Sequence, residues 1–474
     1  MSYSQFDRRS RNSQKRHSNQ WRLFRLICYL IDYVSSLRAV WFAFACTTMV
    51  CCCRLRAQNC VFQSPQGHPY SWKVTYLPQT GLPRGPALKV VAFGDSVVWG
   101  DGDKPKHKIV KIVSQRIADL TGRPVELRSY AHSAARLAVS DADSKPTFPV
   151  HNGKPLGDLD SERPTTSEQV DCAAQEDSDA DYVLLDGCIN EIGAEHIALP
   201  PVIYPPSKRI SAAEIRSEVL NYCSANMANT LITITHHFRN AHVVVLDYFR
   251  VVSKASEPKP ADTEAERKQQ GKENAQRERN LERVIKKEKN MESLPGSGTP
   301  EQRAIQAWTD NSDEFLKDTT SCFKWAIDAV NAGAVGPISN PQGVPYTASD
   351  PESIWPAVCP SFSAQGTVIG PKPPIPIVPA SFPDNQDYSY GAPNTHLWLL
   401  PDPFINPDEL YWRRAWECLL HPFRGDTACF INPIAHPKYI GAQCYSESIL
   451  NAVGFAISKP DPNCQSAESM VAAQ

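Results

Sequence analysis

The sequence has almost no net charge, and this absence excludes one broad class of partner. Its 49 lysine and arginine residues nearly balance 51 aspartate and glutamate residues, which leaves a formal charge of −2. A chain balanced in this way has no global field that attracts nucleic acid, so no nucleic-acid partner is expected. The sequence also has no internal repeat and no second run of core-like elements. One domain of ordinary or large size is therefore predicted, with the 40 prolines in long irregular connections.

Two motifs that would support specific chemistry are missing as well. No asparagine stands in a glycosylation sequon, and no cysteine after Cys53 forms a C-x-x-C pair or lies beside a spaced histidine pair. The sequence therefore predicts no zinc site, no other metal and no cofactor. The cysteines after position 53 are Cys60, Cys172, Cys188, Cys223, Cys322, Cys359, Cys418, Cys429, Cys444 and Cys464. Their even number favours disulfides in an exported chain, although the spacing leaves the pairing open.

The N-terminal part differs from the rest of the chain in charge and hydropathy. Residues 1–38 carry eight arginine and lysine residues and precede an apolar run at residues 39–53. A basic region followed by an apolar core is typical of a secretory signal peptide, and the run is shorter than the ~20 residues that span a bilayer. We therefore expect export, with residues 1–60 as a basic arm and signal segment. Two alternatives stay open: a signal anchor that attaches the chain to a membrane through residues 39–53, and a disordered arm.

Residues 86–458 alternate between strand-like and helix-like patterns. The predicted strands are residues 88–93, 125–130, 182–185 and 243–246, and the predicted helices are residues 108–120 and 212–238. Strands that are apolar on both faces, with helices between them, imply a parallel sheet covered on each side. The predicted fold class is α/β, a three-layer α/β/α sandwich around a central parallel sheet. No feature of the sequence indicates an oligomeric state.

Three long segments interrupt this pattern. Residues 140–178 are polar and rich in proline and aspartate, which predicts a surface loop. Residues 256–296 are dominated by lysine, glutamate, arginine and glutamine without an apolar face, which predicts a solvated helix or disorder. Residues 333–393 are rich in proline and predict coil that packs on the domain or over its site. Residues 459–474 are expected to form a flexible tail.

A polar triplet ends the first predicted strand. The stretch VVAFGDSVVWG, residues 90–100, passes directly from apolar residues into Gly94, Asp95 and Ser96. In a parallel sheet this position lies at the carboxyl edge, where open α/β sheets bind their ligands. A serine placed there is either a nucleophile or the N-cap of the helix that follows.

Three further polar blocks follow in a set order. They are YAHSAAR at residues 130–136, DGCINEIG at residues 186–193 and AHPKYIG at residues 435–441. Together with the G-D-S triplet, these blocks resemble the GDSL esterase and lipase family, also called SGNH hydrolases. The resemblance covers residues 86–250 and 394–458 and implies a flavodoxin-like sandwich fold.

The resemblance also implies an activity and a site. In that family the serine of the G-D-S block is the nucleophile, and a C-terminal histidine followed by proline is the base. Carried onto this chain, these residues are Ser96 and His436. The oxyanion hole would come from the backbone N–H groups of Ser96 and Ala134 and the side-chain amide of Asn190. The implied substrate is a carboxylic ester, such as a lipid or an acylated sugar.

The second and third blocks depart from the pattern of the family. Ala134 stands where the family usually has glycine, and its N–H remains available if its φ is negative. The third block has one residue more between Gly187 and Asn190 than the family's spacing.

The C-terminal block lacks the acid that the family usually has three residues before its histidine. Pro433 stands at that position in this chain. Two candidates therefore remain for orienting His436, the backbone carbonyl of Pro433 and the carboxylate of Asp426.

Each block also has a purely structural interpretation. Ser96 is a candidate helix N-cap, Asn190 is a candidate cap for a helix near Glu191, and His436 with Pro437 can simply open the last helix. If those roles were the whole explanation, the alternative function would be a catalytically inactive module that binds an anion or a partner at the first helix N-terminus. The serine esterase is the favoured hypothesis because all the blocks fall at loop ends of one parallel sheet.

Overall fold

The computed structural model describes most of the α/β domain and leaves several segments outside. The described residues are 71–138 except 101, 102 and 104, then 164–199, 208–253, 300–347, 349, 355–382, 388–389, 396–397, 436–457, 461 and 464. Predictions for the N-terminal arm at residues 1–60 and the charged segment at residues 256–296 fall outside these ranges and stay predictions. In the described part of the chain, no helix is both long and apolar enough to cross a membrane.

A six-stranded sheet with the order β1-β3-β2-β4-β5-β6 forms the middle layer. The strands are β1 (Trp72–Tyr76), β2 (Leu88–Phe93), β3 (Val125–Ser129), β4 (Tyr182–Leu185), β5 (His242–Leu246) and β6 (Val378–Ala380). All pairs are parallel except β1 with β3, which is antiparallel. The four predicted strands are confirmed, but the sheet is mixed rather than entirely parallel.

The burial of each strand explains whether it could be predicted from the sequence. Strands β2, β4 and β5 lie inside the sheet, and nearly all their residues are buried on both faces, which gives continuous apolar runs. The edge strand β1 has the sequence WKVTY and alternates between half-buried and exposed residues. Its apolar signal is therefore weak, and the strand was missed.

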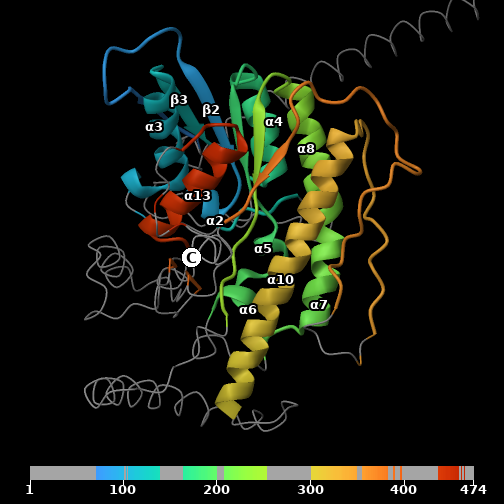
Figure 1. Ribbon diagram of the computed structural model, residues 1–474. Coiled ribbons are helices and arrows are strands. Elements are labelled where there is room, and N and C mark those ends of the chain that lie inside the picture. Colours follow the sequence, from blue (N-terminus) through green and yellow to red (C-terminus); the bar gives the residue numbers. More distant parts are fainter. Residues whose placement is uncertain are drawn as a thin grey trace, which may run out of the picture. The chain divides into compact units, whose positions relative to one another are not determined.

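Helices cover both faces of the sheet (Figure 1). Helices α3 (Ile109–Thr121) and α13 (Tyr439–Ala452) pack together on one face. Helices α4 (Thr166–Glu176), α8 (Ala225–His237) and α10 (Pro300–Asn331) pack together on the other face. The shorter elements are α2 (Ser96–Trp99), η1 (Pro105–His107), α5 (Ile189–Ile192), α6 (Ala194–Ala198), α7 (Ala212–Glu218) and η3 (Val219–Ser224). The predicted three-layer α/β/α sandwich is confirmed.

The helix predicted at residues 212–238 is continuous but contains a wider turn. It begins with a capping box in which Ser211 and Glu214 exchange hydrogen bonds, and it runs through α7, η3 and α8. The middle element η3 is a π-helical turn, and Cys223 within it forms a disulfide with Cys188. Wider turns of this kind are often found near functional sites.

The surface loop predicted at residues 140–178 is wrong for its C-terminal part, which forms helix α4. Residues 139–163 lie outside the described ranges. The Oγ1 of Thr165 accepts the N–H of Glu168 at 3.3 Å, and the Glu168 carboxylate accepts the N–H of Thr165 at 2.9 Å. This T-x-x-E capping box was the overlooked signal, and the apolar residues that the helix buries are Val170, Cys172 and Ala173.

The proline-rich segment at residues 333–393 is mostly coil in its described part, as predicted. Part of it packs on the helical layer, where the side chain of Asn340 accepts a hydrogen bond from Ser224 at 2.9 Å. The segment also contributes strand β6, which pairs with β5 at the sheet edge. That strand was missed because it is only three residues long and includes Pro379.

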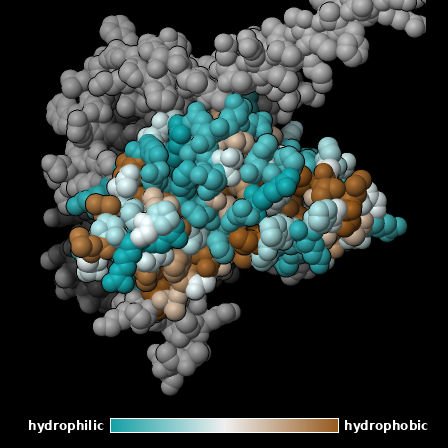
Figure 2. All heavy atoms as spheres, turned by 90° about the horizontal axis from the view of Figure 1, so that it is seen from above, coloured by the Kyte–Doolittle hydropathy of each residue, from teal (hydrophilic) through white to brown (hydrophobic). Residues whose placement is uncertain are grey.

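Three disulfides join described residues, and they confirm the expected cross-linking for six of the ten cysteines. The pairs are Cys188–Cys223, Cys322–Cys359 and Cys444–Cys464. Each pair connects a helix to a loop or to a neighbouring segment. Figure 2 shows one face of the molecule, with hydrophilic side chains over its centre and apolar groups toward its margins. Most large apolar side chains of the described residues are buried.

Candidate active site

Ser96 and His436 contact each other across most of the length of the chain. Nε2 of His436 lies 2.7 Å from Oγ of Ser96, although the two residues are 340 positions apart. Ser96 is the first residue of α2, directly after β2, and only 8% of it is exposed. A histidine nitrogen within hydrogen-bond distance of a serine hydroxyl is the arrangement that activates a nucleophile.

The turn that carries Ser96 depends on the two residues before it. Gly94 has φ 137°, and a Cβ at this position would lie 1.7 Å from a carboxylate oxygen of Asp186. The N-cap of α2 is Asp95, whose side chain accepts the N–H of Val97 at 2.8 Å. The interpretation of Ser96 as an N-cap is therefore wrong, because its hydroxyl contacts His436 instead.

Asp186 holds the same turn from the neighbouring strand. One of its carboxylate oxygens accepts the N–H of Asp95 at 2.8 Å, and the other accepts the N–H of Val98 at 3.2 Å. Burial, followed by the nearby Asp95 carboxylate, raises the pKa of Asp186 well above its usual range. The side chain of Gln169 completes this support, since its Oε1 accepts the N–H of Gly94 at 2.8 Å. No role for Asp186 or Gln169 was predicted from the sequence.

Ala134 lies in a turn after β3 and departs from the expected backbone. Its φ is 60°, so the condition of a negative φ is not met, although its N–H has no acceptor among the described residues. The turn needs a left-handed residue, which is the conformation that glycine adopts freely and alanine adopts at a cost of about 1 kcal/mol. Within the described residues, neither the N–H of Ala134 nor that of Ser96 has a hydrogen-bond acceptor. Both donors are therefore available.

Asn190 lies in α5, with its side chain directed at the same turn. Its Nδ2 donates to the carbonyl oxygen of Ala135 at 2.9 Å. The residue at the N-cap of α5 is Cys188, and no side-chain cap is present, so the interpretation of Asn190 as a helix cap is wrong. A side-chain amide has two N–H groups, so Asn190 keeps one donor beyond its bond to Ala135.

Glu191 fixes the other end of the turn that contains Ala134. Its Oε1 accepts the N–H of Leu137 and, at 3.3 Å, the N–H of Ala138. Burial raises the pKa of Glu191 to about 8. Consecutive residues of α5, Asn190 and Glu191, thus bind both sides of the loop after β3.

The extra residue of the third block is accommodated by two residues with positive φ. Gly187 has φ 143° and Cys188 has φ 127°. The chain turns sharply here, and α5 begins immediately afterwards at Ile189. The disulfide to Cys223 anchors Cys188 in this position.

His436 is placed by contacts on the residues that follow it. Pro437 pairs with Leu397, and the N–H of Lys438 donates to the carbonyl oxygen of His396 at 2.8 Å. Helix α13 begins only at Tyr439, so His436 lies before the helix rather than in its first turn. The Nδ1 of His436 is buried and has no hydrogen-bond partner within the part of the chain that the structure describes. Pro433 and Asp426 lie outside that part.

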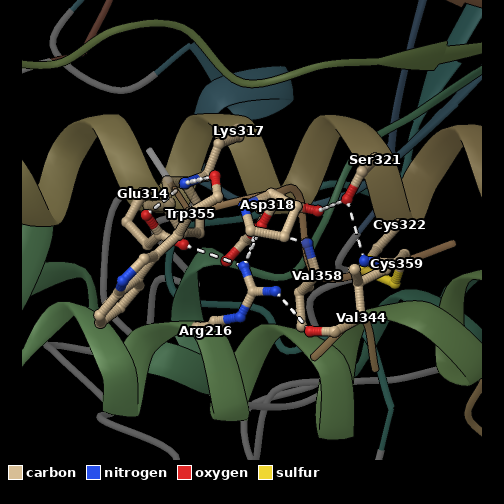
Figure 3. A network of polar contacts seen from close by, with 12 residues as sticks. Arg216, Glu314, Lys317, Asp318, Ser321, Cys322, Val344, Trp355, Val358 and Cys359 are labelled. Carbon is tan, nitrogen blue, oxygen red and sulfur yellow. Dashed lines mark hydrogen bonds and ion pairs between the residues drawn. A yellow bond between two sulfur atoms is a disulfide. The ribbon is translucent and has the colours of Figure 1, made fainter. Parts of the chain in front are cut away.

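A second buried polar cluster lies away from Ser96, between α7 and α10 (Figure 3). The guanidinium of Arg216 contacts Glu314 at 3.3 Å and Asp318 at 3.4 Å, and all three side chains are buried. Arg216 also donates to the carbonyl oxygens of Val344 (2.8 Å) and Pro356. The cluster therefore fastens the proline-rich segment to the helical layer. It contains no serine–histidine pair and no oxyanion donors directed at a common point.

The described side chains offer no evident metal centre. Among them, no group of three or more histidine, cysteine, aspartate or glutamate residues is arranged to hold a metal ion. The chemistry that this site can perform with its own groups is proton transfer, nucleophilic attack and hydrogen bonding to a developing negative charge.

Comparison with known proteins gives distant likenesses only. No protein-family model matches the chain, and no curated protein matches it. An extracellular lipase from Streptomyces rimosus is 16% identical over 59% of this chain and 95% of that chain, with a TM-score of 0.28. Phospholipase A1 from Streptomyces albidoflavus is 16% identical over 58% of this chain and 93% of that chain, with a TM-score of 0.23.

A carbohydrate esterase family 2 enzyme with a carbohydrate-binding domain, from Corynascus thermopiles (Myceliophthora fergusii), is more distant. It is 13% identical over 52% of this chain and 69% of that chain, with a TM-score of 0.21. Likenesses at this level assign neither an activity nor a substrate to this chain.

Proposed function

We propose that the protein is a serine esterase of the GDSL type that hydrolyses carboxylic esters. The observation that supports this proposal most strongly is the 2.7 Å contact between Nε2 of His436 and Oγ of Ser96 at the carboxyl edge of the sheet. The oxyanion hole of this proposal consists of the amide of Asn190 and the N–H groups of Ser96 and Ala134, which have no acceptor among the described residues.

In the proposed acylation step, Oγ of Ser96 attacks the carbonyl carbon of the ester while His436 takes the hydroxyl proton. The carbonyl oxygen becomes an oxyanion, and the three donors stabilise it by roughly 3 kcal/mol each. The bond to the alcohol then breaks, and the imidazolium returns the proton to the departing alkoxide. The acyl group remains on Ser96.

Deacylation repeats these transfers with water. The oxygen of a water molecule attacks the acyl carbon while His436 takes a proton from that water. The same three donors stabilise the oxyanion of the second tetrahedral intermediate. When the intermediate collapses, the proton passes to Oγ of Ser96 and the carboxylic acid leaves. No electron transfer and no cofactor is required in this sequence.

A fluorophosphonate probe tests the proposal directly, because it forms a covalent bond only with an activated serine. We expect labelling of the intact protein at Ser96 and none in Ser96→Ala or His436→Ala. Ser114→Ala is a matched control, since this buried serine donates to a helix carbonyl oxygen, that of Val110, at 2.7 Å. Folded protein that remains unlabelled would overturn the esterase and favour the anion-binding module.

The substrate class and the location of the protein are also part of the proposal. The ester is a lipid or an acylated sugar, and turnover of a panel of short-chain, long-chain and sugar acyl esters would distinguish these substrates. The protein is exported, either released or attached to a membrane through residues 39–53. The three disulfides support export, because such bonds persist in oxidising compartments. We assign the hydrolase domain to residues 86–458, and strand β1 (Trp72–Tyr76) extends its sheet beyond the first of these bounds.

A further inference from the structure

Tyr248 contacts two of the loops that carry proposed catalytic groups. It follows β5 and is only 4% exposed. Its hydroxyl donates to Oδ2 of Asp95 at 2.7 Å and accepts the N–H of Ile189 at 3.0 Å. Asp95 directly precedes Ser96, and Ile189 directly precedes Asn190. One oxygen atom therefore joins the nucleophile loop to the loop of the oxyanion donor.

The ring of Tyr248 is held by helix α10. Its centroid lies 5.0 Å from that of Phe315 and 6.1 Å from that of Phe323. Burial, followed by the negative charge of Asp95, raises the pKa of the Tyr248 hydroxyl well above its usual range. The hydroxyl therefore stays protonated and donates a hydrogen bond to the Asp95 carboxylate.

The residue before Tyr248 makes a corresponding contact with the histidine side of the site. The carbonyl oxygen of Asp247 accepts a hydrogen bond from the hydroxyl of Tyr445, which lies in α13. Helix α13 begins three residues after His436. The dipeptide Asp247–Tyr248 thus contacts the loops that carry Ser96 and Asn190 and the helix that follows His436.

We propose that Tyr248 is a positioning residue that sets the distance between Ser96 and the Asn190 amide. This inference rests on the proposed esterase function. Catalytic groups need to be held within ~0.5 Å of their productive geometry, and residues that bind two loops at once do this most directly. We assign Tyr248 no direct part in the reaction, because its hydroxyl donates to Asp95 and accepts from Ile189.

The test replaces only the hydroxyl. Tyr248→Phe keeps the ring between Phe315 and Phe323, and we expect kcat on a p-nitrophenyl ester to fall by roughly ten- to hundredfold, since small misplacements cost rates of this size. KM should change by less than about threefold, because binding of the substrate in its ground state does not depend on the oxyanion donors. Labelling of Ser96 by a fluorophosphonate should slow by a similar factor.

Tyr130→Phe is the matched control. Tyr130 is also buried, at 6% exposed, and its hydroxyl also donates to a carboxylate, that of Asp177, at 2.9 Å. That contact lies at the C-terminal end of α4 and does not involve Ser96 or Asn190. We expect Tyr130→Phe to lower the melting temperature while leaving kcat unchanged. A purely structural role for Tyr248 would give the same pattern in Tyr248→Phe and would overturn the proposal.

Amide hydrogen exchange separates this inference from the esterase proposal. We expect Tyr248→Phe to speed exchange in peptides that cover residues 95–99 and residues 189–192, and Tyr130→Phe to speed neither. Unchanged exchange at either loop would overturn the positioning role, whatever the activity of the parent protein. A parent that neither turns over esters nor reacts with the probe would instead overturn the proposed function, and exchange alone would then decide whether Tyr248 couples the loops.

Discussion

The side-chain amide of Asn190 donates to the carbonyl oxygen of Ala135, 2.9 Å away, in the turn that also contains Ala134. If its second N–H stabilises the oxyanion, Asn190→Ala should lower kcat by roughly 10² to 10³ with little change in KM. The interaction strengthens only in the transition state, so substrate binding is preserved. Steady-state kinetics on a soluble ester would measure both constants.

Asn229→Ala is the control for this prediction. Asn229 also uses its amide to hold a loop, since Nδ2 donates to the carbonyl oxygen of Ile338 at 3.1 Å and Oδ1 accepts the N–H of the same residue at 2.8 Å. It lies in α8, away from Ser96. This variant should lose stability of about 1 kcal/mol and keep its turnover. A kcat of Asn190→Ala within a few-fold of the parent would remove Asn190 from the oxyanion hole.

Ala134→Gly should leave turnover unchanged and leave the free energy of unfolding equal or up to about 1 kcal/mol higher. Glycine adopts the φ of 60° found here without strain, and this gain of about 1 kcal/mol is partly offset by the greater freedom of glycine in the unfolded chain. Ala134→Val should have the opposite effect, because a β-branched residue strongly disfavours this backbone conformation. Urea unfolding of the three proteins would rank them. A clearly destabilised glycine variant would contradict the left-handed turn.

The strands of the core could be predicted because each carries its signal locally. Residues 88–93 and 182–185 are apolar without interruption, and the structure places strands β2 and β4 at these residues. Helix α10 was not predicted, although its apolar residues recur with a helical period. Its buried face also includes Glu314 and Asp318, which contact Arg216 of α7, and only the folded chain shows these contacts.

The residues of the candidate site also fall into those with a local sequence signal and those without one. Ser96 and His436 could be named from the sequence because each stands in a short block after or before a regular element, and the structure brings the two side chains together. Tyr248 and Gln169 have no such block. Their roles consist of contacts across loops that are distant in sequence, and only the folded chain shows these contacts.

Asp318 should make stability depend on pH. Burial, followed by the nearby Glu314, raises the pKa of Asp318 to about 8. The unfolded chain releases this proton near its ordinary pKa of about 3.9, whereas the folded chain keeps it until the pH approaches 8. The free energy of unfolding should therefore decrease as the pH rises from about 4 to about 8, by on the order of a few kcal/mol from this group. Urea unfolding across this range would measure the slope.

Asp318→Asn isolates this contribution. The amide oxygen can still accept the N–H of Val358, now 2.7 Å from Oδ1, and the amide N–H groups can donate to Glu314. Arg216 and Lys317, which also face this cluster, keep their contacts with Glu314. We expect the variant to lose the part of the pH slope that Asp318 causes. A slope identical to that of the parent would show that Asp318 is ionised in the folded protein.

The remaining nitrogen of His436 gives the last prediction. Nε2 contacts Ser96, so Nδ1 must carry the proton and needs an acceptor that fixes this tautomer. No described residue provides one, although Nδ1 is buried. We expect the backbone carbonyl of Pro433, three residues before His436, to accept this hydrogen bond without a carboxylate. A change of the acid to its amide costs about 10⁴ in kcat where a triad carboxylate orients the histidine.

The two candidates for orienting His436 therefore predict different variants. If the carbonyl of Pro433 is the acceptor, Asp426→Asn should stay within about tenfold of the parent, while His436→Ala should lose roughly 10³ or more in kcat. If Asp426 completes a triad, kcat of Asp426→Asn should fall nearly as far as kcat of His436→Ala. The amide would favour the tautomer of His436 that carries its proton on Nε2, and this tautomer cannot accept the proton of Ser96. Kinetics of both variants, with folding checked by circular dichroism, would choose between a dyad and a triad. A well-folded Asp426→Asn whose kcat falls nearly as far as that of His436→Ala would reject the dyad, because the dyad gives the Asp426 carboxylate no role.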